Sequence, residues 1–315
     1  MTAKKTPTVA DVKGSPARIR GLLDELNRAN PEMSLAVAAV KVLASTVRST
    51  QAATMTELTL KLTEASAELK KSAPKNYSII AGCESFLKQL NHTDYHGVSV
   101  DECKQRILEF EENFVANAST FVEKISSVGA NLIKDGSVIL IHSFSRVVMQ
   151  LLQHAARQNK RYSVIATESR PSQFGEKAVA YLQKLNIPVK LVPDSAVGFI
   201  MEKVDLVLVG AEAVVENGGL INQMGTYQIA LVAKAANKPF YAVTESYKFV
   251  RMFPLSQTDV ELPEHRIDQA IPSTASNYSF ATEHHVDYTP PHLVSSLITN
   301  LGVLTPSGVV HILLS

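Results

Sequence analysis

The fold is decided by residues 205–243, which read DLVLVGAEAVVENGGLINQMGTYQIALVAKAANKPFYAV. Leu206–Val209 is a short apolar run of the kind that forms a parallel strand covered on both faces. The polar residues that follow, with a turn-forming run at 217–219, predict a loop. Apolar residues at helical spacing after Gly225 predict a helix, and a second apolar run closes the stretch. The stretch therefore predicts a strand, a loop, a helix and a strand.

The same strand pattern recurs through the second part of the chain. Further short β-rich runs lie at Ser137–Ile141, Tyr162–Ala166, Val189–Val192 and Phe240–Val243, and helical segments separate most of them. Because strands that alternate with helices form parallel sheets, we predict a Rossmann-like, doubly wound α/β domain over residues 131–315. Residues 256–285 are polar and are expected to be irregular. Thr289-Pro290-Pro291 is expected to lead directly into a last amphipathic helix.

Residues 1–130 have helical spacing instead, and are predicted to form a helical domain of four or five elements. Ser15-Pro16 supplies a helix start, and Leu35–Val47 is small and apolar enough for a helix that is buried on most sides. Leu58–Leu69 repeats at helical spacing. The capping box Ser99-Val100-Asp101-Glu102 then starts a helix of about eight turns.

The composition indicates a soluble globular protein. The 315 residues, 45% of them hydrophobic, can bury one large or two medium cores. The 31 basic and 30 acidic residues leave a net charge of +1, so no overall field attracts nucleic acid or membranes. Two cysteines, Cys83 and Cys103, exclude a disulfide framework and fit a reducing compartment. Since there is no signal-peptide pattern and no membrane-length apolar run, we expect a cytosolic or nuclear protein, with the cytoplasm preferred, and no direct nucleic-acid or membrane partner.

Polar side chains follow several of the predicted strands. Because parallel strands end at one edge of a sheet, where α/β proteins bind ligands, we expect these side chains to meet in one crevice. The predicted ligand-binding residues are His142, Ser143, Ser145, Arg146, Glu168, Arg170, Glu212 and Asn222. Arginines and hydroxyls at helix N-termini suit a phosphate, while carboxylates and an amide suit sugar hydroxyls. The alternative is that the arginines pair with Glu168 and Glu212 as buried structural salt bridges.

Other kinds of site find less support. His284-His285 has no carboxylate or cysteine at ligand spacing, so no metal is predicted. Ser143 is next to His142, but adjacent strand residues point to opposite faces and no G-x-S-x-G elbow surrounds the serine, which argues against a hydrolase triad. The glycines at 218 and 219 match neither the dinucleotide fingerprint nor a P-loop, so no nucleotide cofactor is predicted.

The motifs at these positions resemble a known family. They are HSFSRVV, TESRPSQFG, AVGFIMEKVDLVLVGAEAVVENGGLINQMGT, NKPFYAVTESYKFVRMFPL, VDYTPPHL and LGVLTPSGV. They are similar to the alpha subunits of eukaryotic translation initiation factor 2B, almost end to end in the sheet domain and more loosely in the helical domain. The resemblance implies a regulatory subunit of a guanine-nucleotide exchange complex in the integrated stress response. It also implies homodimers, beta and delta partner subunits, and a role in sensing the phosphorylated alpha subunit of translation initiation factor 2.

The same motifs are similar, at greater distance, to methylthioribose-1-phosphate and ribose-1,5-bisphosphate isomerases. That similarity implies a catalytic cysteine and aspartate where this chain has Ser143 and Glu212, and an asparagine-lysine pair where it has Asn222-Gln223. A hydroxyl does not replace a thiolate in proton transfer, and a longer side chain displaces the carboxylate. We therefore predict no catalytic residues and no cofactor, but a vestigial pocket for a sugar phosphate or another anion. The alternative is an active aldose-ketose isomerase with Glu212 and His142 as acid and base.

Two surfaces are candidates for protein partners. The residues predicted to contact the phosphorylated partner are Thr46, Arg48, Ser49, Thr50 and Thr54. Their hydroxyls and guanidinium could face a phosphoserine, or they could form an ordinary capped turn between helices. The apolar segments Phe249–Leu255 and Tyr288–Val310 predict a homodimer surface, unless they only cover the last strand of the sheet.

Overall fold

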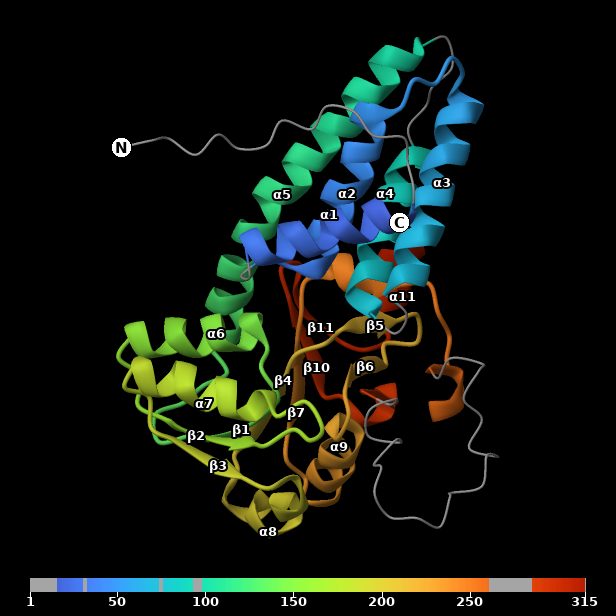
Figure 1. Cartoon of the computed structure of the whole chain (residues 1–315). Coiled ribbons are helices and arrows are strands. Elements are labelled where there is room, and N and C mark those ends of the chain that lie inside the picture. The colour runs from blue at the N-terminus through green and yellow to red at the C-terminus, as the bar shows by residue number, and fades with distance from the viewer. Residues whose placement is uncertain (1–15, 31–32, 74–75, 93–97, 261–284, 315) are drawn as a thin grey trace, which may run out of the picture. The chain divides into compact units, whose positions relative to one another are not determined.

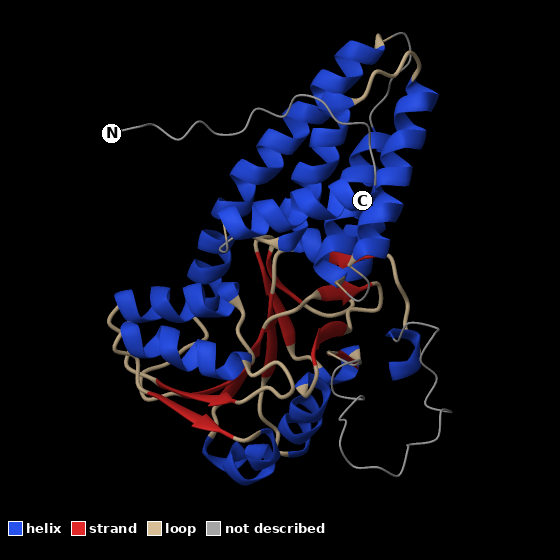
Figure 2. Ribbon diagram, in the orientation of Figure 1, coloured by secondary structure: helices blue, strands red, loops and turns tan. Residues whose placement is uncertain are grey.

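The computed structural model describes residues 16–30, 33–73, 76–92, 98–260 and 285–314. They belong to two compact units (Figure 1): unit 1 contains residues up to 74 and 82–116, and unit 2 contains residues 75–81 and 117–315. The first elements of the chain are helices and the strands come later; Figure 2 distinguishes the two kinds by colour. The predicted α/β class with an N-terminal helical region is therefore confirmed. The domain boundary at residue 130 stays a prediction.

The described residues of the N-terminal part of the chain form five helices. They are α1 (Pro16–Ala29), α2 (Leu35–Ser49), α3 (Met55–Ser72), α4 (Tyr77–His92) and α5 (Val100–Ala130). The predicted cap of α5 is present, because the Glu102 backbone N–H donates to Ser99 Oγ over 3.2 Å. That helix has 31 residues, in agreement with the predicted eight turns. Burial raises the pKa of the Cys83 thiol to about 11, so this cysteine is an unreactive core residue.

A seven-stranded sheet forms the centre of unit 2, in the order β11-β10-β7-β4-β1-β2-β3. Its strands are β1 (Val138–His142), β2 (Ser163–Thr167), β3 (Val189–Val192), β4 (Leu206–Val209), β7 (Phe240–Val243), β10 (Ser296–Thr299) and β11 (Gly302–Leu304). All neighbours are parallel except β10 and β11. Every predicted strand is present to within one residue. The strand order reverses between β1 and β4, where doubly wound sheets bind ligands.

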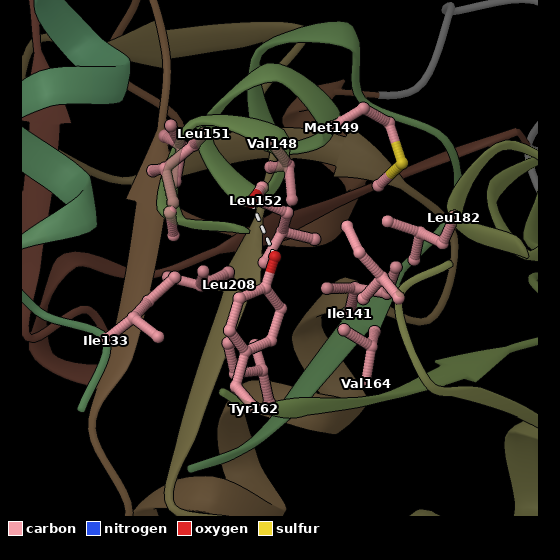
Figure 3. Close-up of a cluster of buried hydrophobic side chains, with 14 of the residues drawn as sticks. Ile133, Ile141, Val148, Met149, Leu151, Leu152, Tyr162, Val164, Leu182 and Leu208 are labelled. Carbon is pink, nitrogen blue, oxygen red and sulfur yellow. Dashed lines mark hydrogen bonds between the residues drawn. The ribbon is translucent and has the colours of Figure 1, made fainter. Parts of the chain in front are cut away.

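Helices cover both faces of this sheet. They are α6 (Arg146–Arg157), α7 (Phe174–Lys184), α8 (Val197–Ile200), α9 (Thr226–Ala235) and α11 (Gly308–Leu314). Side chains alternate along a strand, so Ile139 and Ile141 of β1 pack in the core beneath α6 and α7, while Leu140 packs in the core that includes α8 and α9. Figure 3 shows the first core, in which the Tyr162 hydroxyl donates to the Leu152 carbonyl.

A second, four-stranded sheet has the order β8-β5-β6-β9. Its strands are β5 (Ala213–Val215), β6 (Leu220–Gln223), β8 (Phe249–Val250) and β9 (Val286–Thr289). The prediction of a loop after β4 is therefore wrong: residues 213–223 form a hairpin whose apolar residues are buried. Gly218 turns this hairpin with φ +81°, and an added Cβ would clash with the Pro306 carbonyl oxygen.

The prediction of a final helix directly after residue 291 is also wrong. Residues 296–304 form β10 and β11, because β10 completes the parallel ladder beside β7, and only α11 is helical. The remaining elements are short 3-10 turns: η1 (Asp194–Ala196), η2 (Met201–Lys203), η3 (Ser246–Lys248), η4 (Gln257–Val260) and η5 (Pro291–Leu293). Most of the predicted irregular segment, residues 261–284, lies outside the described residues. Among the helices that are described, none has the length and apolar character needed to cross a membrane.

Candidate functional site

His142 ends β1 as a buried structural residue. Its ring is within hydrogen-bond distance of Thr167 Oγ1 (Nδ1, 2.6 Å) and of the Met224 carbonyl oxygen (Nε2, 2.8 Å). A carbonyl only accepts, so Nε2 carries the proton and Nδ1 accepts from the threonine. Burial lowers the pKa of His142 below its usual 6.5, and the ring is neutral at neutral pH. His142 therefore holds the loop before α9 in place.

Ser143, Ser145 and Arg146 follow at the start of α6. Ser143 has a left-handed backbone, with φ +64°, and its buried Oγ has no hydrogen-bond partner among the described residues. Ser145 caps α6 by accepting from the Val148 N–H at 3.4 Å. A Cβ on Gly210 would lie 2.6 Å from Ser145 Oγ, so the end of β4 approaches this cap closely.

A buried ion pair adjoins these residues, and sequence reasoning missed it. Glu245 follows β7, and its Oε2 lies 3.1 Å from Lys248 Nζ, with side-chain exposures of 2% and 12%. The Tyr247 hydroxyl donates to Glu245 Oε1 over 2.9 Å, and Lys248 donates to the Ala211 carbonyl oxygen over 3.0 Å. Burial opposes ionisation of Glu245, but Lys248, with a smaller contribution from Arg146, keeps the pKa of this carboxyl below its usual value.

These residues together form what we call the strand-end cluster. Its members are Ser143, Ser145, Arg146, Thr244, Glu245 and Lys248. They follow β1 and β7, the two strands that flank β4 in the sheet. Thr244 resembles Ser143, because its buried Oγ1 also has no hydrogen-bond partner in the described part of the chain. The sequence contained a pattern that could have identified the missed residues, because Thr244 and Glu245 follow a predicted strand just as Ser143 does.

Glu212 and Asn222 are held by other parts of unit 2. Ser78 Oγ donates to Glu212 Oε2 over 2.8 Å, and Gln223 Nε2 donates to Glu212 Oε1 over 3.4 Å. Asn222 is buried and donates to Thr226 Oγ1 over 3.0 Å, at the start of α9. Both carboxylate oxygens of Glu212 therefore have donors within the protein.

Glu168 and Arg170 form a surface pair after β2. Arg170 Nε lies 3.0 Å from Glu168 Oε2, with side-chain exposures of 55% and 29%. The alternative prediction of a pair is correct for these residues, but the pair is not buried and contributes at most about 1 kcal/mol to stability. Arg170 also lines a cavity of about 380 Å³, together with Asp194, Gly225, Tyr227 and Asp287. Of the predicted ligand residues in the described chain, it alone lines this cavity.

Of the residues predicted to contact a phosphorylated partner, Thr46, Arg48 and Ser49 lie in the last turn of α2, and Thr50 and Thr54 lie between α2 and α3. Thr46 and Ser49 donate their hydroxyls to backbone carbonyls of α2 over 3.2 Å each, and Thr54 caps α3 by accepting from the Glu57 N–H. These hydroxyls thus have the local bonds of ordinary helix ends. Arg48 Nη2 lies 2.6 Å from Glu111 Oε2, yet the arginine side chain is 47% exposed.

Metal ligands are a separate question. Residues of the types that bind metals do not gather in groups of three or more anywhere in the part of the chain that the structure describes. Of the weak candidate pair His284-His285, His284 lies outside the described residues.

Comparisons with known proteins agree with this architecture. The model of the initiation factor 2 subunit family matches residues 28–306. The chain is 43% identical over 297 residues to translation initiation factor eIF2B subunit alpha of Dictyostelium discoideum, covering 91% of this chain and 92% of that protein. It is 35% identical over 213 residues to ribose 1,5-bisphosphate isomerase of Archaeoglobus fulgidus, covering 67% and 68%.

Solved structures share the fold as well. The crystal structure of translation initiation factor eIF-2B from Pyrococcus horikoshii superposes with a TM-score of 0.70 at 26% identity, covering 93% of this chain and 98% of that one. The family match spans both the helical part and the sheet domain, and the eIF2B alpha relative aligns over 92% of its length. The chain therefore belongs to the initiation factor 2 subunit family.

Proposed function

We propose that this chain is a non-catalytic regulatory subunit of the translation initiation factor 2B guanine-nucleotide exchange complex. The similarity to an eIF2B alpha subunit supports this, because it covers nine-tenths of both chains at 43% identity, whereas the isomerase similarity covers about two-thirds at 35%. On this proposal the chain assembles with beta and delta subunits and helps to sense the phosphorylated alpha subunit of translation initiation factor 2.

The observation that carries the non-catalytic assignment is the state of Ser143 and Glu212. Proton transfer between sugar carbons needs a base that is ionised near neutral pH and a second group free to reach the substrate. Ser143 offers a hydroxyl, which is not ionised at neutral pH. Both carboxylate oxygens of Glu212 already accept hydrogen bonds, from Ser78 and Gln223. These observations support a site without the acid and base of an isomerase.

The strand-end cluster is the proposed site for a sugar phosphate or another anion. Arg146 and Lys248 supply two cations, and Lys248 can replace the lysine that the isomerases have where this chain has Gln223. The buried hydroxyls of Ser143 and Thr244 have no partner among the described residues and could bond a ligand. A ligand that binds only the folded chain would stabilise it by mass action.

Exposed apolar side chains support the proposed homodimer. Within the segments predicted to form its surface, Phe253, Leu255 and Val303 are 60%, 83% and 50% exposed, whereas Phe249 and Tyr288 are buried core residues. A two-fold interface would remove the exposed side chains from water. Light scattering at micromolar concentration should give twice the chain mass. A single-chain mass that persists as the concentration rises contradicts the homodimer.

Arg48 is the proposed contact for the phosphorylated partner. Its half-exposed guanidinium can turn from Glu111 to a phosphate, which offers a stronger charge. Arg48→Ala should weaken binding of the phosphorylated partner by about tenfold and leave binding of the unphosphorylated partner unchanged. Arg106→Ala is the matched control, since Arg106 is also a half-exposed arginine paired with a glutamate. Equal losses for both forms of the partner would refute the role of Arg48.

A direct assay separates the regulatory proposal from the alternative isomerase. The purified chain is incubated with ribose 1,5-bisphosphate, and aldose-ketose conversion is followed by NMR. No conversion above background, together with incorporation of the chain into a complex with beta and delta subunits, is the expected result. Conversion at enzyme-like rates that is lost in Glu212→Ala would establish the isomerase instead.

A further inference from the structure

Asp287 lies at the wall of the 380 Å³ cavity and is the key residue of a second site. It belongs to β9, and its Oδ2 accepts from the Gly225 N–H over 2.7 Å and from the Tyr227 N–H over 3.0 Å, at the start of α9. The carboxylate therefore occupies the position at this helix N-terminus where an external anion would otherwise bind. An anion at that point would meet a like charge.

The other oxygen of Asp287 lacks a partner. Oδ1 is buried and has no hydrogen bond to any described residue, and the residue as a whole is only 7% exposed. Buried carboxylate oxygens are normally satisfied, and an unpaired one is costly. Asp287 lines the cavity, so a donor that reaches Oδ1 from the cavity would supply the missing partner.

The charges around the cavity favour a cationic donor. Two carboxylates, Asp194 and Asp287, and one guanidinium, Arg170, line it, and Glu168 already partly balances that guanidinium. Asp194 accepts from the Ser169 and Arg170 backbone N–H groups over 2.9 and 2.8 Å, so both of its oxygens have partners. Each carboxylate accepts from two backbone N–H groups, and the guanidinium on the wall pairs with Glu168, so the wall has an excess of negative charge and Asp287 Oδ1 is its carboxylate oxygen without a donor.

The remaining lining limits the size and character of the ligand. A volume of about 380 Å³ lies near the lower end of small-molecule sites. Val260 and Val286, with the side chains of Met224 and Tyr227, supply apolar contacts. None of the strand-end cluster residues lines this cavity, so the site is separate from the proposed anion site.

We propose that this cavity binds a small organic cation whose ammonium or guanidinium group donates to Asp287 Oδ1 and whose short aliphatic part contacts Val286 and Met224. The site is independent of the proposed regulatory function. Bound cation would complete the hydrogen bonding of Asp287 and fix the start of α9 against β9.

Titration of Asp287 provides a signature of such binding. Burial raises the pKa of Asp287 to about 7, although the N–H groups of α9 oppose this. The titratable or charged side chains on the cavity wall beside Asp287 are Arg170, Asp194 and Tyr227; the His142 ring lies against Gly225, and η4, which packs against β9, carries Asp259. A cation favours the ionised carboxylate, so its binding near pH 7 should release a fraction of a proton, and affinity should rise as the pH rises through 7.

The test titrates butylguanidinium into the full chain by calorimetry, with butyrate as the anionic probe for comparison. Saturable binding of butylguanidinium, with proton release measured in buffers of different ionisation enthalpy, is the expected result. Asp287→Asn keeps an oxygen that can cap α9 but removes the charge, and should weaken binding by about tenfold or more. Glu202→Gln removes an exposed carboxylate outside the cavity and should leave binding unchanged.

The variant Arg170→Gln provides a second, independent test of the proposed cation site. Removing a like charge from the wall should strengthen butylguanidinium binding severalfold, whereas an anion site would lose affinity. This side chain is 55% exposed, so the variant should fold even where Asp287→Asn does not. The proposal is overturned if butyrate binds more tightly than butylguanidinium, if neither binds saturably, or if Arg170→Gln weakens butylguanidinium binding.

Discussion

The buried pair Glu245–Lys248 allows a quantitative prediction. Lys248→Met keeps the length and apolar stem of the side chain but removes the ammonium that lies 3.1 Å from the Glu245 carboxylate. Breaking a buried pair by removing one partner typically costs about 3–5 kcal/mol, because the other charge remains uncompensated. Arg146 still contributes a favourable field at Glu245, so we expect a loss of about 3 kcal/mol in the free energy of unfolding at pH 7.

A double variant tests the physical cause of that loss. Glu245→Gln in the Lys248→Met background removes the remaining buried charge and keeps an oxygen that can accept from Tyr247. We expect the double variant to recover most of the lost stability, since a neutral pair avoids the desolvation of an unpaired ion. Lys61→Met is the surface control: its pair with Glu57 is 39% exposed on both sides, and its loss should cost less than about 1 kcal/mol.

The stability loss caused by Lys248→Met should depend on pH in a defined direction. In the native chain the pKa of Glu245 is below its usual 4.5, so the stability it contributes is present above that value and is lost as the pH falls through the folded pKa. Without Lys248, burial acts with less opposition and the carboxyl takes up a proton more readily. The stability deficit of Lys248→Met should therefore be largest at pH 7 and shrink toward pH 5.

Urea unfolding followed by circular dichroism measures these differences, provided that the variants keep the same dependence on urea concentration. A deficit for Lys248→Met below about 1 kcal/mol would show that the pair behaves as a solvated one. A double variant no more stable than Lys248→Met, or a deficit independent of pH, would show that lost packing and not the unpaired charge causes the effect.

Three further predictions concern unit 2. Asp287 has its pKa raised to about 7, so its contribution to stability should decline as the pH rises from about 4 to 7, and Asp287→Asn should flatten that part of the pH profile of unfolding. Glu212→Ala leaves its two side-chain donors, Ser78 and Gln223, without their acceptor, and should lower the free energy of unfolding by about 1–3 kcal/mol. Urea unfolding measures this loss, and an unchanged midpoint would contradict the assigned hydrogen bonds. Gly225→Ala places a Cβ 2.9 Å from the His142 ring at φ +105°, and should destabilise more than Gly136→Ala, whose φ is +82° but whose Cβ meets open space; equal shifts in melting temperature would contradict the close contact.

Much of the candidate site was predictable, because strand ends are visible in the sequence. Ser143, Ser145 and Arg146 follow β1, and the rule that parallel strands end at one edge placed them correctly at the sheet's carboxyl edge. That all eight predicted residues share one crevice stays a prediction, and of them Arg170 lines the described cavity. Glu212 bonds to Ser78, which is 134 positions away in sequence, and no local pattern announces such a contact.

The sequence by itself determined the elements whose signal is local. Five strands of the large sheet and the start of α5 follow from apolar periodicity and a capping box, since these patterns report which face of a short segment is buried. Only the tertiary structure decided the second sheet and the tail strand β10, because pairing of β9 with β6 and of β10 with β7 joins segments distant in the chain. The electrostatic environment of the charged residues was also decided by the tertiary structure. Burial makes Glu245 and Lys248 an ion pair shielded from water, and it leaves Asp287 with an oxygen that has no partner among the described residues. Burial depends on the folded surroundings, which a local sequence pattern does not report.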